Sequence, residues 1–103
     1  MAVVLYNISI LLYRLIIGLV APFNEKAKKF ITGRKNIFER LEKDFSEIDS
    51  PVVWFHCASL GEFEQGRPVI EAFRKSSLNH KILVTFFSPS GYELRKNYTE
   101  ADF

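Results

Sequence analysis

Residues 1–23 form an apolar segment that constrains the fold of this chain more than any other feature. The one charged side chain in the segment is Arg14, and the length is sufficient for a membrane helix, which needs about 20 residues. On a helix, Asn7, Arg14 and Gly18 would lie on one stripe while the other faces stay apolar. A charge near the middle of a span is costly, so an interfacial or tilted helix competes with a transmembrane one.

A basic cluster follows this segment directly. It consists of Lys26, Lys28, Lys29, Arg34 and Lys35. Under the positive-inside rule such a cluster places the rest of the chain in the cytoplasm, and it would meet anionic lipid head groups. The alternative is a solvated helix face. We expect a membrane-binding helix over residues 3–20, and no cleaved signal peptide, because no Lys or Arg precedes Arg14.

Composition and cysteine usage exclude several classes of protein. With 48% hydrophobic and 25% charged residues the chain is not disordered. A net charge of +2 is too small an excess to predict a nucleic-acid partner. Cys57 is the only cysteine, which excludes an internal disulfide and a cysteine-based metal motif. We interpret it as a small buried hydrophobe.

Residues 24–50 read as linking helices. Gly33 is the predicted break, and Ile37, Leu41 and Phe45 form an apolar stripe at i, i+4 and i+8. The pattern changes after Pro51, where residues 52–57 are a continuous β-prone run typical of a strand buried on both faces.

The remainder predicts a helix, a second strand and a second helix. Apolar and small residues recur at helical spacing from Phe63 to Phe73, with the main helix starting near Pro68. Ser76, Ser77 and Asn79 predict a turn, residues 81–87 a buried strand and residues 92–98 a helix, and residues 101–103 would open a third strand. The order βαβα predicts an α/β fold with a parallel sheet. Such a sheet needs helices on both faces, so we expect the natural chain to continue past Phe103.

Two polar loops follow the predicted strands, at residues 58–62 and 88–91. Ligands of open parallel sheets bind beyond the carboxyl ends of the strands, which makes these loops the candidate site. The candidate residues are Ser59, Gly61, Glu62, Ser88, Ser90 and Gly91. A carboxylate at Glu62 could act as a general base. The spacing alone favours a structural role, because Ser59 with Glu62, and Ser90 with Glu93, match the capping box S-x-x-E.

The sequence indicates an anion, nucleotide or metal ligand only weakly. The turns at Gly61 and Gly91 could present backbone amides to an anion, but neither has the repeated glycines of a nucleotide-binding fingerprint. His56 is interpreted as a hydrogen-bonded core histidine, since no second ligand stands at metal spacing. No metal site is predicted.

The run from Trp54 to Glu62, WFHCASLGE, resembles the W-x-H-x-A-S-x-G-E signature of the Kdo transferases, which transfer 3-deoxy-D-manno-octulosonic acid (Kdo). Residues 82–91 resemble their second strand and its T-x-x-T-P-T-G loop, with Ser88 and Ser90 in place of threonines and Phe87 at a usually smaller position. The apolar start and the basic region with Gly33 and Arg34 also resemble that family.

The resemblance implies a GT-B glycosyltransferase, of which this chain is the N-terminal Rossmann-like half, with an anchor over residues 1–23, linking helices over 24–50 and the acceptor-side domain starting at 51. It implies lipopolysaccharide biosynthesis at the cytoplasmic face of the inner membrane. The donor is CMP-Kdo, bound mainly by a C-terminal domain, the acceptor is a lipid A precursor, and no cofactor or metal is implied. The family's glutamate corresponds to Glu62, which would be the catalytic base.

Two other interpretations remain open. One is a non-catalytic binding module that docks on lipid or on a partner chain, and we expect the isolated 103 residues to lack transferase activity. The other is an unrelated membrane-tethered α/β protein whose capping boxes mimic the signature.

Overall fold

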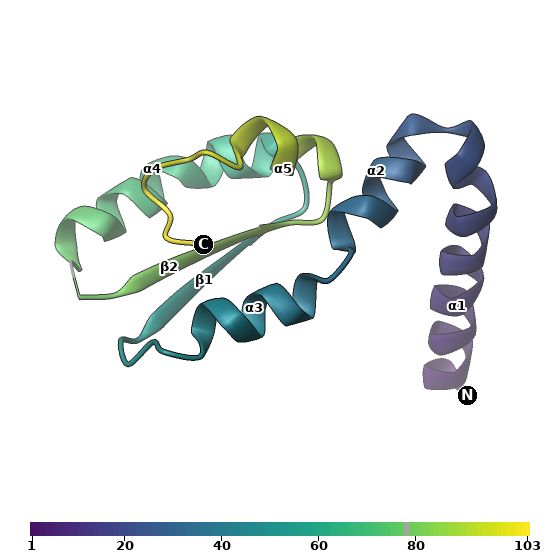
Figure 1. Ribbon diagram of the computed structural model, residues 1–103, viewed down its shortest axis with the longest axis horizontal. Helices are drawn as coiled ribbons and strands as arrows, with labels where there is room; N and C mark the ends of the chain where they lie inside the picture. Colours follow the sequence, from purple (N-terminus) through teal and green to yellow (C-terminus); the bar gives the residue numbers. More distant parts are fainter. Residues whose placement is uncertain (78) are drawn as a thin grey trace. The chain divides into compact units, whose positions relative to one another are not determined.

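The computed structural model describes residues 1–77 and 79–103. They divide into two compact units, Met1–Lys35 and Asn36–Phe103. The first unit is helical, and the second contains a small parallel sheet with helices (Figure 1). The predicted α/β class with a parallel sheet is confirmed.

The first unit is a helical hairpin. Helix α1 (Ala2–Val20) is followed by the 3-10 turn η1 (Ala21–Phe23) and helix α2 (Glu25–Arg34). Pro22 in the first turn of η1 suits a change of helix type, because proline is tolerated there. The Asn24 side chain caps α2 by accepting from the N–H of Ala27 at 3.1 Å. The prediction of a helix over residues 3–20 is confirmed, and Ala2–Phe23 is long and apolar enough to cross a membrane.

An aromatic contact holds α2 against α1, and a cation–π contact lies within α2 beside it. The rings of Tyr13 and Phe30 meet edge to face, with centroids 6.1 Å apart. The guanidinium of Arg34 lies 3.5 Å from the centroid of the Phe30 ring, and Arg34 also donates to the carbonyl of Phe30 at 3.1 Å. Aromatic pairs of this kind contribute about 0.5–1.5 kcal/mol and partly exposed cation–π contacts about 0.5–1 kcal/mol.

The break after α2 lies at Asn36. Asn36 adopts a left-handed conformation with φ of 57°, which asparagine tolerates better than most residues. Gly33 lies inside α2, so the predicted break at Gly33 is wrong. Helix α3 (Ile37–Phe45) follows, and the predicted stripe of Ile37, Leu41 and Phe45 is half-buried.

The sheet of the second unit has two parallel strands, β1 (Val52–Cys57) and β2 (Lys81–Phe86). They pair in register from Val52 opposite Lys81 to Cys57 opposite Phe86. Helix α4 (Leu60–Ser76) connects them, and α5 (Pro89–Arg95) follows β2 on the same side of the sheet as α4 (Figure 1). Arg95 on α5 donates to Glu64 Oε1 on α4 at 2.7 Å, which ties the two helices together.

The core lies on the α4 side of the sheet. It consists of Cys57, Phe63, Ile70 and Ile82. Phe63, Ile70 and Ile82 are fully buried, and full burial of such a side chain contributes about 1.5–3 kcal/mol. Along β1 the other face carries Val52, Trp54 and His56, which are exposed. The prediction that β1 is buried on both faces is therefore wrong for the described chain.

The helix boundaries differ from the predictions. Ser59 caps α4 and the helix begins at Leu60, so Pro68 lies in its interior. The cap and the apolar face toward the sheet outweigh the proline, whose cost in a helix is about 3 kcal/mol. Helix α5 begins at Pro89, earlier than the predicted residue 92, because proline is favoured in a first turn. Part of the turn predicted from Ser76, Ser77 and Asn79 falls on Leu78, which lies outside the described residues. The His80 N–H donates to the Ser77 carbonyl at 3.3 Å.

The C-terminal segment, residues 101–103, lies along the free edge of β2. Phe103 N–H donates to the Ile82 carbonyl at 3.2 Å, and Val84 N–H donates to the Phe103 carbonyl at 3.1 Å. This is the hydrogen-bond pattern of a parallel pair. The segment is not a regular strand, but it pairs as the predicted third strand would.

Asp102 fastens this segment to β2 and α4. Its Oδ2 accepts from Arg74 at 2.5 Å and from the Ile82 N–H at 2.8 Å. Arg74 also donates to the carbonyls of Glu100 and His80 at 3.0–3.1 Å. Burial opposes ionisation of Asp102, but the bonds from Arg74 and Ile82, with the charges of Arg74 and Lys81, outweigh it and lower the pKa of Asp102.

We expect Asp102→Asn to reduce the loss of stability in acid. Because the folded-state pKa is lowered, the contribution of Asp102 is complete above the unfolded-chain pKa of about 3.9 and disappears as pH falls through the folded pKa. Chemical unfolding at pH 6 and pH 3 measures this. The variant should be less stable than the parent at pH 6, with the difference shrinking at pH 3, and a difference that is equal at both pH values would contradict it.

Candidate active site

The parallel register brings the two predicted loops into contact. Beyond the ends of the strands the hydrogen bonding continues, with Phe87 N–H donating to the Cys57 carbonyl and Ser88 N–H to the Ala58 carbonyl, both at 3.0 Å. The loop between β1 and α4 and the loop between β2 and α5 are therefore joined directly at the carboxyl edge of the sheet. This is the edge where open parallel sheets bind their ligands.

Glu62 lies in the first turn of α4, where its backbone and side chain are both engaged. Its N–H donates to Ser59 Oγ at 3.3 Å, and its Oε2 accepts from the Ala58 N–H at 2.5 Å. In an ordinary capping box the carboxylate would bond the N–H of the capping residue itself, so the contact here is displaced by one residue. The capping contacts predicted for Ser59 and Glu62 are present in this modified form.

The same geometry leaves part of the carboxylate available. Glu62 is exposed, and its second oxygen, Oε1, has no hydrogen-bond partner among residues 1–77 and 79–103. One oxygen is thus fixed by the backbone while the side chain as a whole stays exposed. A carboxylate held in this way is oriented without being neutralised by a cation, as a proton acceptor requires.

The second loop differs from its prediction. Ser88 stands at the N-cap position of α5 without a side-chain capping bond, and its Oγ lies 2.9 Å from Ser90 Oγ. Ser90 lies within α5, and the Glu93 carboxylate pairs with Lys96 at 2.9 Å. The predicted capping box with Ser90 at the helix start is therefore wrong, because Pro89 begins the helix two residues earlier than that pattern requires.

The two loop glycines have different environments. Gly91 is buried, and a Cβ there would lie 3.0 Å from the Phe86 ring and 3.2 Å from the backbone nitrogen of Leu60. The absence of a side chain is what allows α5 to approach the start of α4. Gly61 is exposed, with Ser59 Oγ as its near neighbour at 3.8 Å. Both glycines lie in first helical turns, and neither has a positive φ.

Gly91→Ala should therefore separate the two loops. The added methyl meets backbone at Leu60, so we expect a destabilisation of about 1–3 kcal/mol, the usual cost of overpacking. Gly66→Ala is the matched control, since a Cβ there has nothing within 4 Å, and glycine to alanine in an open helical position stabilises by about 0.5–1 kcal/mol. Denaturant unfolding compares them, and equal effects of the two substitutions would contradict the close approach.

Cys57 lies beneath this edge with 6% of its surface exposed. Burial, and then the charge of the Glu62 carboxylate, raise the pKa of the Cys57 thiol. It therefore stays protonated at neutral pH and behaves as the predicted small hydrophobe rather than as a nucleophile.

His56 lies on the opposite, exposed face of the sheet, so its interpretation as a core histidine is wrong. Its Nδ1 is 2.8 Å from Thr85 Oγ1, which also accepts from the Trp54 indole N–H at 2.8 Å. No single stretch of sequence predicted this cluster. The register could have indicated it, because His56 faces Thr85 in a parallel pair of the predicted strands. No group of three or more His, Cys, Asp or Glu side chains within the described ranges could hold a metal ion.

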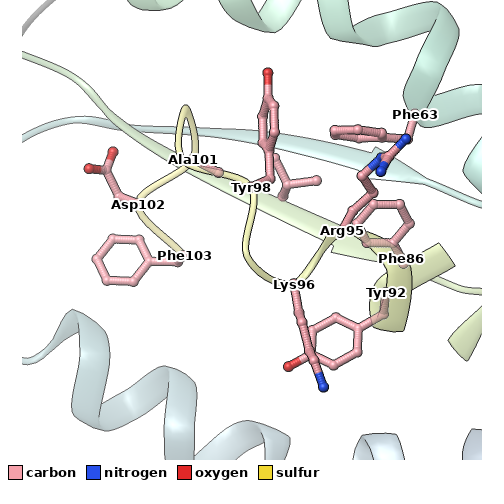
Figure 2. A pocket seen from close by; sticks show the side chains of 10 residues that line it. Phe63, Phe86, Tyr92, Arg95, Lys96, Tyr98, Ala101, Asp102 and Phe103 are labelled. Atoms are coloured by element: carbon pink, nitrogen blue, oxygen red, sulfur yellow. The ribbon is translucent and has the colours of Figure 1, made fainter. Parts of the chain in front are cut away.

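A hollow of about 160 Å³ lies elsewhere on the second unit. Its walls come from α4, β2, α5 and the C-terminal segment (Figure 2). They include Phe63, Val84, Phe86, Tyr92, Lys96 and Phe103. None of the six predicted site residues contributes to it, so this hollow and the loop site are separate features.

Comparison with known proteins identifies this arrangement. The family model described as 3-Deoxy-D-manno-octulosonic-acid transferase (kdotransferase) matches residues 34–103, more than half of the chain and all of the loop site. The chain belongs to the Kdo transferase family. The predicted resemblance to the Kdo transferases is thereby confirmed, and the two joined loops lie within the matched residues.

Two curated relatives are similar to this Kdo transferase family member. A "Bifunctional glycosyltransferase/methyltransferase" of Fusobacterium nucleatum is 35% identical over 91 residues, which are 86% of this chain and 13% of the relative. A "3-deoxy-D-manno-octulosonic acid transferase" of Aquifex aeolicus is 39% identical over 51 residues, 50% of this chain and 13% of the relative. The chain thus spans about an eighth of the length of these relatives. No solved structure matches the chain.

Proposed function

We propose that this chain is the acceptor-side part of an enzyme that transfers Kdo from CMP-Kdo to a lipid A precursor, with Glu62 as general base. The family match supports a glycosyltransferase. The observation that favours Glu62 is its exposed carboxylate, anchored through Oε2 by the Ala58 N–H at the carboxyl edge of the sheet.

In the proposed reaction the free oxygen of Glu62 takes the proton of an acceptor hydroxyl. The hydroxyl oxygen forms a bond to the anomeric carbon of Kdo as the bond from that carbon to CMP breaks, with inversion, and CMP leaves with the electron pair. The Ala58 N–H and the Ser59 cap orient the carboxylate for this step. Loop residues Gly61, Ser88, Ser90 and Gly91 would form the acceptor side, and the step uses no resident cofactor or metal.

The proposal includes an arrangement for the whole enzyme. We expect a GT-B fold in which residues 51–103 begin the N-terminal Rossmann-like domain and a second domain binds most of CMP-Kdo. Residues 1–23 would anchor the enzyme and residues 24–50 link the anchor to this domain, on the cytoplasmic face of the inner membrane. The apolar exposed surface of α1 and the Lys side chains of α2 support the anchor.

Glu62→Gln separates the catalytic from the structural role. Glutamine keeps the side-chain length and an oxygen that accepts from the Ala58 N–H, so the cap should persist. It removes the base. General-base catalysis contributes about 10²–10⁴-fold, and in the full-length enzyme we expect a loss of that size in turnover of CMP-Kdo with lipid acceptor, with little change in thermal stability.

Two further variants complete the comparison. Glu62→Ala should lose activity and also about 0.5–2 kcal/mol of stability, the usual range for a lost cap. Glu93→Gln is the matched control, because Glu93 lies on α5 and pairs with Lys96, and it should keep near-parental turnover. If Glu62→Gln keeps near-parental turnover, Glu62 is a cap and another residue is the base.

A further inference from the structure

Helices α4 and α5 are aligned with each other from the two loops onward. Both begin at the carboxyl edge of the sheet, directly after the loops of the candidate site. Gly91 on α5 lies against Leu60 on α4, since a Cβ at Gly91 would be 3.2 Å from the Leu60 nitrogen. One turn further along both helices, Arg95 on α5 contacts Glu64 on α4 at 2.7 Å. Because the two contacts have the same offset along the chain, the first turns of the two helices match.

The contact between Arg95 and Glu64 is directional. The guanidinium donates from two of its nitrogens, Nε at 2.7 Å and Nη2 at 2.5 Å, to the same carboxylate oxygen, Glu64 Oε1. Figure 2 shows the Arg95 side chain extending toward Phe63, the neighbour of Glu64 on α4. Two hydrogen bonds from one planar group fix the distance between the helices at this turn and also their relative orientation.

Glu64 differs from Glu62 in how its carboxylate is held. Its second oxygen, Oε2, lies 3.4 Å from Arg67 Nη1, so both oxygens of Glu64 face a cation. The hydrogen bond from Arg95, together with the charges of Arg95 and Arg67, lowers the pKa of Glu64. A carboxylate kept ionised by two cations is a poor proton acceptor. Glu64 therefore does not compete with Glu62 for the role of base.

We infer that the Glu64–Arg95 pair is a positioning pair, which holds the loop between β2 and α5 at the distance from Glu62 that the acceptor requires. This inference rests on the proposed function, in which both loops form the acceptor side. Helix α5 is one short rigid element from Pro89 to Arg95, so a shift at Arg95 would move Ser90 relative to Glu62. The pair is about a third exposed and contributes little to global stability, but a misplacement of about 1 Å can lower a rate about 10²-fold.

Glu64→Gln and Arg95→Gln in the full-length enzyme test the pair. Each removes one of the two charges, so we expect the KM for the lipid acceptor to rise and kcat to fall. The combined loss in kcat/KM for the acceptor should be several-fold, up to about 10²-fold. The KM for CMP-Kdo should stay at the parental value, because the second domain is proposed to bind most of the donor. Thermal stability should change little.

A double variant and a matched control complete the design. If the two side chains act as a pair, Glu64→Gln combined with Arg95→Gln should be no worse than either single variant. Lys96→Gln is the control, because Lys96 follows Arg95 in the chain and its ion pair with Glu93, at 2.9 Å, joins two positions of the α5 region rather than two helices. The control should keep the parental KM for the lipid acceptor.

The outcomes separate this inference from the proposed function. If the acceptor KM is unchanged in both single variants while Ser88→Ala raises it, the pair does not position the loop, whatever happens to thermal stability. Losses in the two single variants that multiply in the double variant would also overturn the pair. If Ser88→Ala leaves the acceptor KM unchanged as well, the second loop is not on the acceptor side and both proposals about it fail. The role of Glu62 as base is tested separately by the turnover of Glu62→Gln.

Discussion

The in-register parallel pairing of β1 and β2 determines where the candidate site residues lie. It ends both strands at one edge, and the bonds from Phe87 to Cys57 and from Ser88 to Ala58 extend the pairing into the loops. Gly91 then allows α5 to approach the start of α4. The position of Glu62 depends on this assembly, because its carboxylate is held by the backbone of the first loop rather than by another side chain. A shift in register would separate the loops and leave the helix caps without a common site.

In the first unit, the free energy of opening the helical hairpin is compared with the free energy of placing all of α1 in hydrocarbon. Opening it would lose the aromatic pair of Tyr13 and Phe30, worth about 0.5–1.5 kcal/mol, and placing Arg14 in hydrocarbon costs about 2.5–3.5 kcal/mol more. Transfer of the apolar residues from Leu15 to Val20 into hydrocarbon would contribute a favourable free energy of about 0.3–0.6 kcal/mol each. The balance favours the closed hairpin, so the same side chains that make α1 apolar do not require it to be inserted along its whole length.

The sequence predicted the elements whose signals are local. The apolar run gave α1, the β-prone runs gave both strands, and the spacing of Ser59 and Glu62 gave the cap of α4. The predictions failed where adjacent residues or contacts with another element decide the local structure. The break fell at Asn36 rather than Gly33, and Pro89 started α5 ahead of the expected Ser90 cap. The cluster of His56 with Thr85 and the contact of Tyr13 with Phe30 depend on pairing between separate elements, which no single window of sequence contains.

The central claim is that the two loops act as one site around Glu62, and a double-mutant cycle on kcat/KM tests it most directly. The cycle combines Glu62→Gln with Ser88→Ala in the full-length enzyme and measures Kdo transfer from CMP-Kdo to the lipid acceptor. Residues that act as a unit are not additive, so the account predicts a coupling of about 0.5–3 kcal/mol between the two substitutions. Effects that add within about 0.3–0.5 kcal/mol, the behaviour of independent sites, would contradict it.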